Sequence, residues 1–162
     1  MTALPWILFG IAAAVAVAGL IVVAVRQQRQ VAHVRAHSLQ QVIVAAHQLA
    51  GAAMSIPPGN EPTAVSLWWR LMEAHEATLT IDLSMLAQLP PDDRRASARA
   101  EVSGAQDALR AAVATDRSVR VGPPAPTDEN LAYSAAIVRE RANALRDRAD
   151  ALEALVLPTA VH

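Results

Sequence analysis

Two histidines, His33 and His37, are the residues whose spacing most resembles the beginning of a metal site. Side chains four positions apart lie on one face of a helix, so both imidazoles would be able to reach the same ion. A metal site needs several converging donors, however, and no aspartate or glutamate precedes Glu61. The sequence therefore predicts a solvated histidine pair, with no bound metal and no other cofactor.

His75 is a candidate for acid–base chemistry because it lies beside Glu73 and Glu76. Catalysis would also require a nucleophile or a third group that orients the imidazole, and the sequence places neither with it. Ion pairs on a helix surface are the simpler interpretation. The chain also has no cysteine, no phosphate-binding or dinucleotide-binding glycine loop, and neither an HExxH nor a GxSxG motif. We therefore predict that it is not an enzyme, and we identify no small-molecule substrate.

The charge of the chain is nearly balanced but unevenly distributed. Its 14 basic and 15 acidic residues give a net charge of −1, and no extended basic run is present. Nucleic acids bind to strongly basic faces, so a nucleic-acid partner is not expected. All the acidic residues lie at or beyond Glu61, whereas Arg26, Arg29 and Arg35 precede it. These arginines are candidates for contact with anionic lipid headgroups; the alternative is the ordinary positive flank of a membrane helix.

Residues 4–25 form a stretch of 22 positions without a charged side chain. As a helix it would be about 33 Å long, which is enough to cross a hydrocarbon core of about 30 Å. A cleaved signal peptide is the alternative, but no arginine or lysine precedes the stretch. We therefore expect residues 1–25 to be a single-pass anchor in the cell membrane. The arginines that follow the stretch predict a C-terminal domain in the cytoplasm.

Two groups of residues are candidates for contacts with other proteins. Gly10, Ala14 and Ala18 recur every four positions in the expected anchor, and small residues at this spacing let membrane helices approach closely. They predict association of the anchor with itself or with another membrane protein, unless alanine is simply common here. Trp68 and Trp69 point about 100° apart on a helix, so both rings cannot lie deep in one narrow core. One of them is a candidate interface anchor; covering the end of a bundle is the alternative.

The rest of the chain is predicted to be helical. Hydrophobic residues make up 53% of the sequence but aromatic residues only 3%, a composition that favours close helix packing. No segment alternates with the period of two that strands show, and the apolar residues recur at spacings of three and four. The residues expected to face the core are, in the four successive helices, Leu39, Val42, Ala46, Leu49, Ala53 and Ile56; Val65, Trp68, Met72, Leu79, Leu86 and Leu89; Val102, Ala105, Leu109 and Ala112; and Leu131, Ser134, Val138, Ala142, Leu145, Ala149, Leu152 and Val156. Breaks rich in proline and glycine separate the segments. The predicted elements are a basic stem with a first bundle helix over 26–56, then helices over about 62–89, 91–120 and 127–157, and a tail over 158–162.

Local residue types set the expected helix ends and surface pairs. Pro62 suits the first turn of the second bundle helix, and Thr127 is predicted to cap the last one. Arg146 and Asp150 are expected to pair at a spacing of four on the outer surface. Short connections favour antiparallel neighbours. The predicted fold class is therefore all-α, with one N-terminal transmembrane helix continuing into a three- or four-helix antiparallel bundle.

These features predict a non-enzymatic, membrane-anchored helical-bundle protein that acts as an accessory, assembly or scaffold component of a larger membrane complex. The alternative is a single-span sensor or signal-relay module, in which the stem transmits a change between the bilayer and the bundle. A pH-dependent change in helix packing that disappeared on replacement of His33 and His37 would favour this alternative, because imidazoles charge near pH 6.5.

Overall fold

The computed structural model describes residues 37–88 and 93–156. From Ser38 onward the chain forms one compact unit. Among the described residues, no helix is both long enough and apolar enough to cross a membrane. The expected anchor over 4–25 lies outside the described residues, as do Gly10, Ala14, Ala18, Arg26, Arg29, His33 and Arg35.

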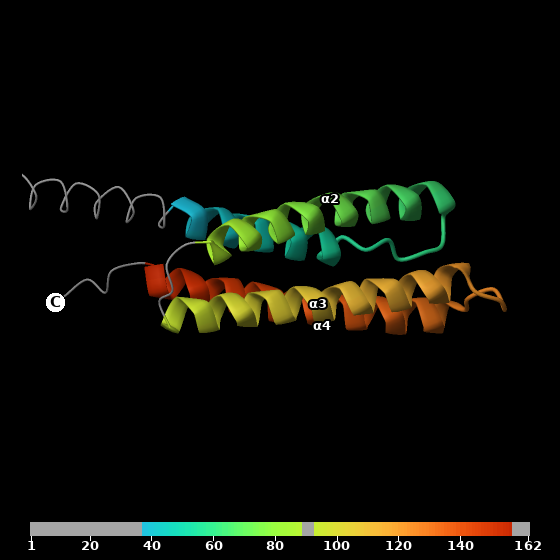
Figure 1. Ribbon diagram of the computed structural model, residues 1–162. Helices are drawn as coiled ribbons and strands as arrows, with labels where there is room; N and C mark the ends of the chain where they lie inside the picture. Colours follow the sequence, from blue (N-terminus) through green and yellow to red (C-terminus); the bar gives the residue numbers. More distant parts are fainter. Residues whose placement is uncertain (1–36, 89–92, 157–162) are drawn as a thin grey trace, which may run out of the picture. The chain divides into compact units, whose positions relative to one another are not determined.

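The described residues fold as an all-helical bundle, as the sequence predicts (Figure 1). A helix over 37–54 is followed by α2 (Pro62–Ala87), α3 (Asp93–Val121) and α4 (Asp128–Val156). In the contacts between α2 and α3, and between α3 and α4, the residue number falls along one helix as it rises along the other. Neighbouring helices are therefore antiparallel. The contacts that establish this order are Glu73–Arg117 and Glu76–Arg110 between α2 and α3, and Glu101–Arg148 and Ser134–Asp116 between α3 and α4.

Helix 37–54 is buried over a wider face than one apolar stripe. The predicted core residues from Leu39 to Ile56 are all buried, which confirms the stripe. Four further residues are also buried because alanine lets neighbouring helices approach on more than one side. No aspartate, glutamate, arginine or lysine occurs between residues 38 and 56, and this was the sequence feature that pointed to deep burial. The additional buried residues are Ile43, Ala45, Ala50 and Ala52.

The α4 helix follows its predicted pattern closely. The backbone N–H of Asn130 donates to the Thr127 hydroxyl at 3.2 Å, which confirms the predicted cap. The predicted apolar stripe also faces the core. Its buried members are Leu131, Ser134, Val138, Ala142, Leu145, Ala149 and Leu152.

The α2 helix begins at Pro62, as predicted, but its cap is an acidic residue that the sequence analysis did not identify. The Glu61 carboxylate accepts hydrogen bonds from the backbone N–H groups of Thr63 and Ala64. Proline at the first helical position lacks an N–H group that the cap would otherwise have to satisfy. The backbone hydrogen bonds, first from Ala64 and then from Thr63, lower the pKa of Glu61 below its ordinary value of 4.5.

This cap predicts a pH-dependent contribution to stability. Because folding lowers the pKa of Glu61, the contribution is complete above the unfolded value of 4.5 and is lost as pH falls through the folded pKa. We expect Glu61→Gln to lower the thermal midpoint at neutral pH, and the difference from wild type to shrink on acidification. Thermal unfolding of both proteins between pH 7 and pH 3 measures it. A difference that stayed constant with pH would argue against a charged cap.

Candidate functional site

The described residues contain a deeply buried ion pair on α3. The Nε atom of Arg120 donates to Oδ2 of Asp116 at 2.6 Å, and the two side chains are only 1% and 0% exposed. Four positions separate them, so one face of the helix presents both. Burial of two charges is costly unless their remaining polar atoms also find partners.

Two other segments supply those partners. The Ser134 hydroxyl on α4 donates to Oδ1 of Asp116 at 2.7 Å. The two terminal nitrogens of Arg120 donate to backbone carbonyls of the loop before α2, Nη1 to Gly59 at 2.6 Å and Nη2 to Pro57 at 3.0 Å. In the same loop, the Asn60 side-chain amide donates to the Arg120 carbonyl at 3.2 Å. We call the set Asp116, Arg120, Ser134 and loop 57–60 the polar latch.

The contacts of the polar latch indicate a structural role. The Ser134 side chain is buried and its hydroxyl donates to Asp116, which leaves it poorly placed to attack a substrate. The Arg120 guanidinium is directed at carbonyls of the loop and at Asp116, so its donors hold the loop to α3. The latch therefore fixes loop 57–60 against α3 and α4.

The polar latch was not predicted from the sequence, although two features indicated it. On α3 the predicted core positions Leu109 and Ala112 are followed, four residues later, by Asp116. On α4 the predicted core stripe includes Ser134. A polar residue on each of two facing core stripes favours a buried hydrogen bond between them.

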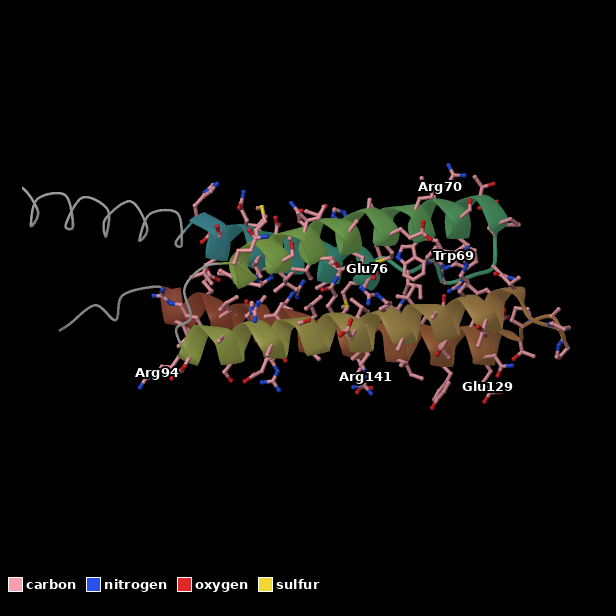
Figure 2. The ribbon with its side chains drawn as sticks, in the orientation of Figure 1. Trp69, Arg70, Glu76, Arg94, Glu129 and Arg141 are labelled. Carbon is pink, nitrogen blue, oxygen red and sulfur yellow. The ribbon has the colours of Figure 1, made fainter. Side chains whose placement is uncertain are left out.

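The two candidate tryptophans lie in different surroundings. Trp68 is 4% exposed, and its Nε1 donates to the Ala52 carbonyl of helix 37–54 at 2.8 Å. Trp69 is half-buried, and the Arg117 guanidinium lies 4.8 Å from the centroid of its ring. Figure 2 shows Trp69 directed toward α3. Trp68 therefore belongs to the core, and the role predicted for Trp69 at an interface stays a prediction.

The acidic neighbours of His75 pair with α3. Glu76 accepts from Arg110, and Glu73 lies 3.4 Å from Nη1 of Arg117. The ion pairs expected within the helix around His75 are not among the contacts of the described residues, because both glutamates pair with arginines of another helix. Figure 2 shows Glu76 in the space between α2 and α3.

The predicted pair between Arg146 and Asp150 is wrong. Asp150 instead lies 3.1 Å from Nε2 of His47, so it joins α4 to helix 37–54. With Glu153 these residues bring three ligand atoms within 4.8 Å of one another. Imidazole and carboxylate ligands suit zinc, but exposed acidic groups gather in this way without a metal, and nothing further in the described residues points to an ion there. We assign the group to the contact between the two helices.

The outer side of α2 carries large apolar side chains that the bundle does not cover. Leu67 and Ile81 are 67% and 58% exposed, and Leu71 and Met85 are each 43% exposed. Arg70, at the border of this surface, points away from α3 and α4 (Figure 2). The core side of α2 lies on a different face, through Val65, Met72, Leu79 and Leu83. We call the exposed row Leu67, Leu71, Ala74, Thr78, Ile81 and Met85 the outer stripe of α2.

Comparisons with known proteins do not identify a family for this chain. No protein-family model matches it, and neither a curated protein nor a solved structure does so.

Proposed function

We propose that this chain is a non-enzymatic, membrane-anchored helical-bundle protein that acts as an accessory, assembly or scaffold component of a larger membrane complex. In this proposal residues 4–25 anchor the chain in the cell membrane, and the bundle faces the cytoplasm. Arg26, Arg29 and Arg35 would lie beside anionic headgroups, each contributing about 1 kcal/mol of attraction.

The observation that carries the proposal is the outer stripe of α2. Contiguous apolar surface that remains exposed on a folded domain commonly marks a site where another protein binds. Covering it removes apolar area from water, at about 25 cal/mol per Å². The buried charges of the bundle, in contrast, are engaged in the polar latch. The bundle thus presents an uncovered apolar face to a partner, as a scaffold component requires.

A second contact is proposed within the anchor. Gly10, Ala14 and Ala18 would form a face on which the anchor packs against another membrane helix or a second copy of itself. The proposal therefore has two protein contacts, one in the bilayer and one on the bundle.

Membrane anchoring is tested by fractionation of cells that express the full chain. Wild type should remain in the membrane pellet after an alkaline carbonate wash. Val15→Arg, at the middle of the 4–25 stretch, should weaken insertion by about 2.5 to 3.5 kcal/mol and release chain from the pellet. The matched control is Gln48→Arg, which adds the same charge at an exposed position of helix 37–54. Wild type in the soluble fraction would contradict the anchor.

Complex formation is tested by purification in a gentle detergent, followed by native mass determination and identification of the bound proteins. Wild type should elute as a complex larger than one chain of 17.2 kDa. Leu67→Glu/Ile81→Glu places charges on the outer stripe and should reduce the mass of the complex. Tyr133→Glu, at a 71% exposed position on α4, should leave it unchanged. Wild type that elutes as a lone monomer would overturn the scaffold proposal and favour the sensor or relay function.

A further inference from the structure

We infer that Gln106 on α3 fixes the position of the second half of α2 along α3 and thereby prevents α2 from sliding on α3. This inference goes beyond the proposed function, because it depends neither on the membrane anchor nor on any partner of the bundle. It is carried by the burial of Gln106 and by the two hydrogen bonds that its amide donates to α2.

Gln106 occupies a core position of α3 that an apolar residue would ordinarily fill. The buried residues of this helix recur at spacings of three and four, and Gln106 is one of them, with only 3% of its surface exposed. Its Nε2 atom donates to the backbone carbonyl of Glu76 at 3.2 Å and to the hydroxyl of Thr80 at 2.8 Å. The Thr80 hydroxyl donates in turn to the Glu76 carbonyl at 2.9 Å. One buried amide therefore binds one turn of α2 directly.

The ion pairs between the two helices select one position of α2 only weakly. Glu76 pairs with Arg110, and Glu73 lies 3.4 Å from Nη1 of Arg117. If α2 moved by three residues, which is about 4.5 Å, Glu73 would take the place of Glu76 opposite Arg110. The same shift would bring Arg70 toward Arg117, but salt screens exposed charges and such pairs contribute little.

Gln106 distinguishes these two positions of α2. After the shift, Ala77 would replace Thr80 opposite the buried amide. Alanine has no hydroxyl, so an amide N–H group of Gln106 would lose its acceptor in a buried place, which is costly. In coiled coils a single buried polar side chain fixes the register of the helices in the same way, at some cost in stability. The register of α2 on α3 is therefore set by Gln106 and Thr80.

Gln106 and the polar latch together hold α2 at two points. The latch binds loop 57–60, directly before α2, to Arg120. Gln106 precedes Arg120 by 14 positions on α3, which corresponds to about 21 Å along the helix. A signal relay through sliding of α2 would require a helix with two arrangements. Two separate attachments leave α2 only one, so the outer stripe of α2 is presented as a fixed surface.

The test measures the distance between two spin labels on the full chain in mild detergent, at cysteines introduced into a sequence that has none. Ser84→Cys/Ala100→Cys reports on the second half of α2 against α3. Ala64→Cys/Ser118→Cys reports on the end that the latch holds, and all four positions are exposed. With the native Gln106, each pair should give one narrow distance. With Gln106→Leu, the distribution of the first pair should become at least twice as wide, and that of the second should not change.

Thermal unfolding separates a role in register from a role in packing alone. When Gln106 is replaced, the Thr80 hydroxyl still donates to the Glu76 carbonyl, so Gln106→Leu should unfold at or above the wild-type midpoint. Asn143→Leu makes an equivalent change at an exposed position of α4 and should leave both distance distributions narrow. A lower midpoint for Gln106→Leu with unchanged distances would mean that Gln106 only fills the core, and it would overturn the inference.

A second variant and a salt titration complete the test. Thr80→Val is nearly isosteric and removes only the hydroxyl, so it should widen the first distribution even if Gln106→Leu does not fold. In 1 M salt the exposed ion pairs between α2 and α3 are screened, yet the wild-type distribution should stay narrow. Narrow distances in both variants would overturn the inference. Widening of the wild-type distances by salt alone would overturn it as well, because the ion pairs would then fix α2.

Discussion

Replacement of Arg120 with methionine should lower the free energy of unfolding of the bundle by about 3–5 kcal/mol. The substitution leaves Asp116 as an uncompensated charge in a buried position, and it removes the donors that the carbonyls of Pro57 and Gly59 accept from. A domain of this size is typically stable by only about 5–15 kcal/mol, so a large part of its stability would be lost. Urea unfolding of the full chain in mild detergent, followed by circular dichroism, measures the change.

Two further variants make this prediction specific to the polar latch. Asp116→Leu/Arg120→Met removes both charges and should recover part of the loss, since the buried carboxylate is no longer present. Arg148→Met removes an exposed arginine that pairs with Glu101 at 2.9 Å, and it should cost less than about 1 kcal/mol. If Arg120→Met were no more harmful than Arg148→Met, the latch would not be a buried ion pair in solution.

Trp68→Ala is the second substitution for which we expect a large effect, about 3–5 kcal/mol. It creates a cavity between α2 and helix 37–54, and it deprives the Ala52 carbonyl of the indole N–H, 2.8 Å away. The same urea titration should show a lower midpoint. Trp68→Phe separates the two effects, because it retains most of the packing and loses only the hydrogen bond, at about 1 kcal/mol.

The neighbouring tryptophan provides the comparison. Trp69→Ala removes a half-buried ring and its contact with Arg117, and it should cost clearly less than Trp68→Ala. Equal losses at the two positions would mean that the two rings are similarly buried, against the geometry described here.

The order and type of the helices were predictable from the sequence because each is encoded locally. Proline at position 62 and threonine at 127 mark two helix starts, and the residues around them form the local contacts that such starts require. The apolar residues that follow each start at spacings of three and four then indicate the buried face. These features concern only neighbours within a few positions, so they do not depend on the rest of the fold.

The polar latch was not predictable in the same way. The spacing of Asp116 and Arg120 suggests an ordinary surface ion pair. Only the hydrogen bonds with Ser134 and loop 57–60 make the burial of this pair favourable. His47 and Asp150 illustrate the same limit, since local spacing favoured Arg146 as the partner. Contacts between distant segments decide both cases, and a helical period carries no information about them.

The outer stripe of α2 was missed for a related reason. The helix has two apolar faces, and only the one that begins at Val65 and Trp68 was predicted to face the core. The periodicity of Leu67, Leu71 and Ile81 is equally regular. Only the arrangement of the other helices determines which face they cover and which remains uncovered.

The polar latch also has a consequence for the order in which the bundle assembles. Its bonds from Arg120 reach back 61 and 63 positions to Gly59 and Pro57, whereas α3 and α4 are joined by a short connection. Closing the larger loop costs more chain entropy, so the α3–α4 hairpin should form before loop 57–60 is fastened to it. The bonds between Arg120 and loop 57–60 then form late in folding, and their loss mainly increases the rate of unfolding.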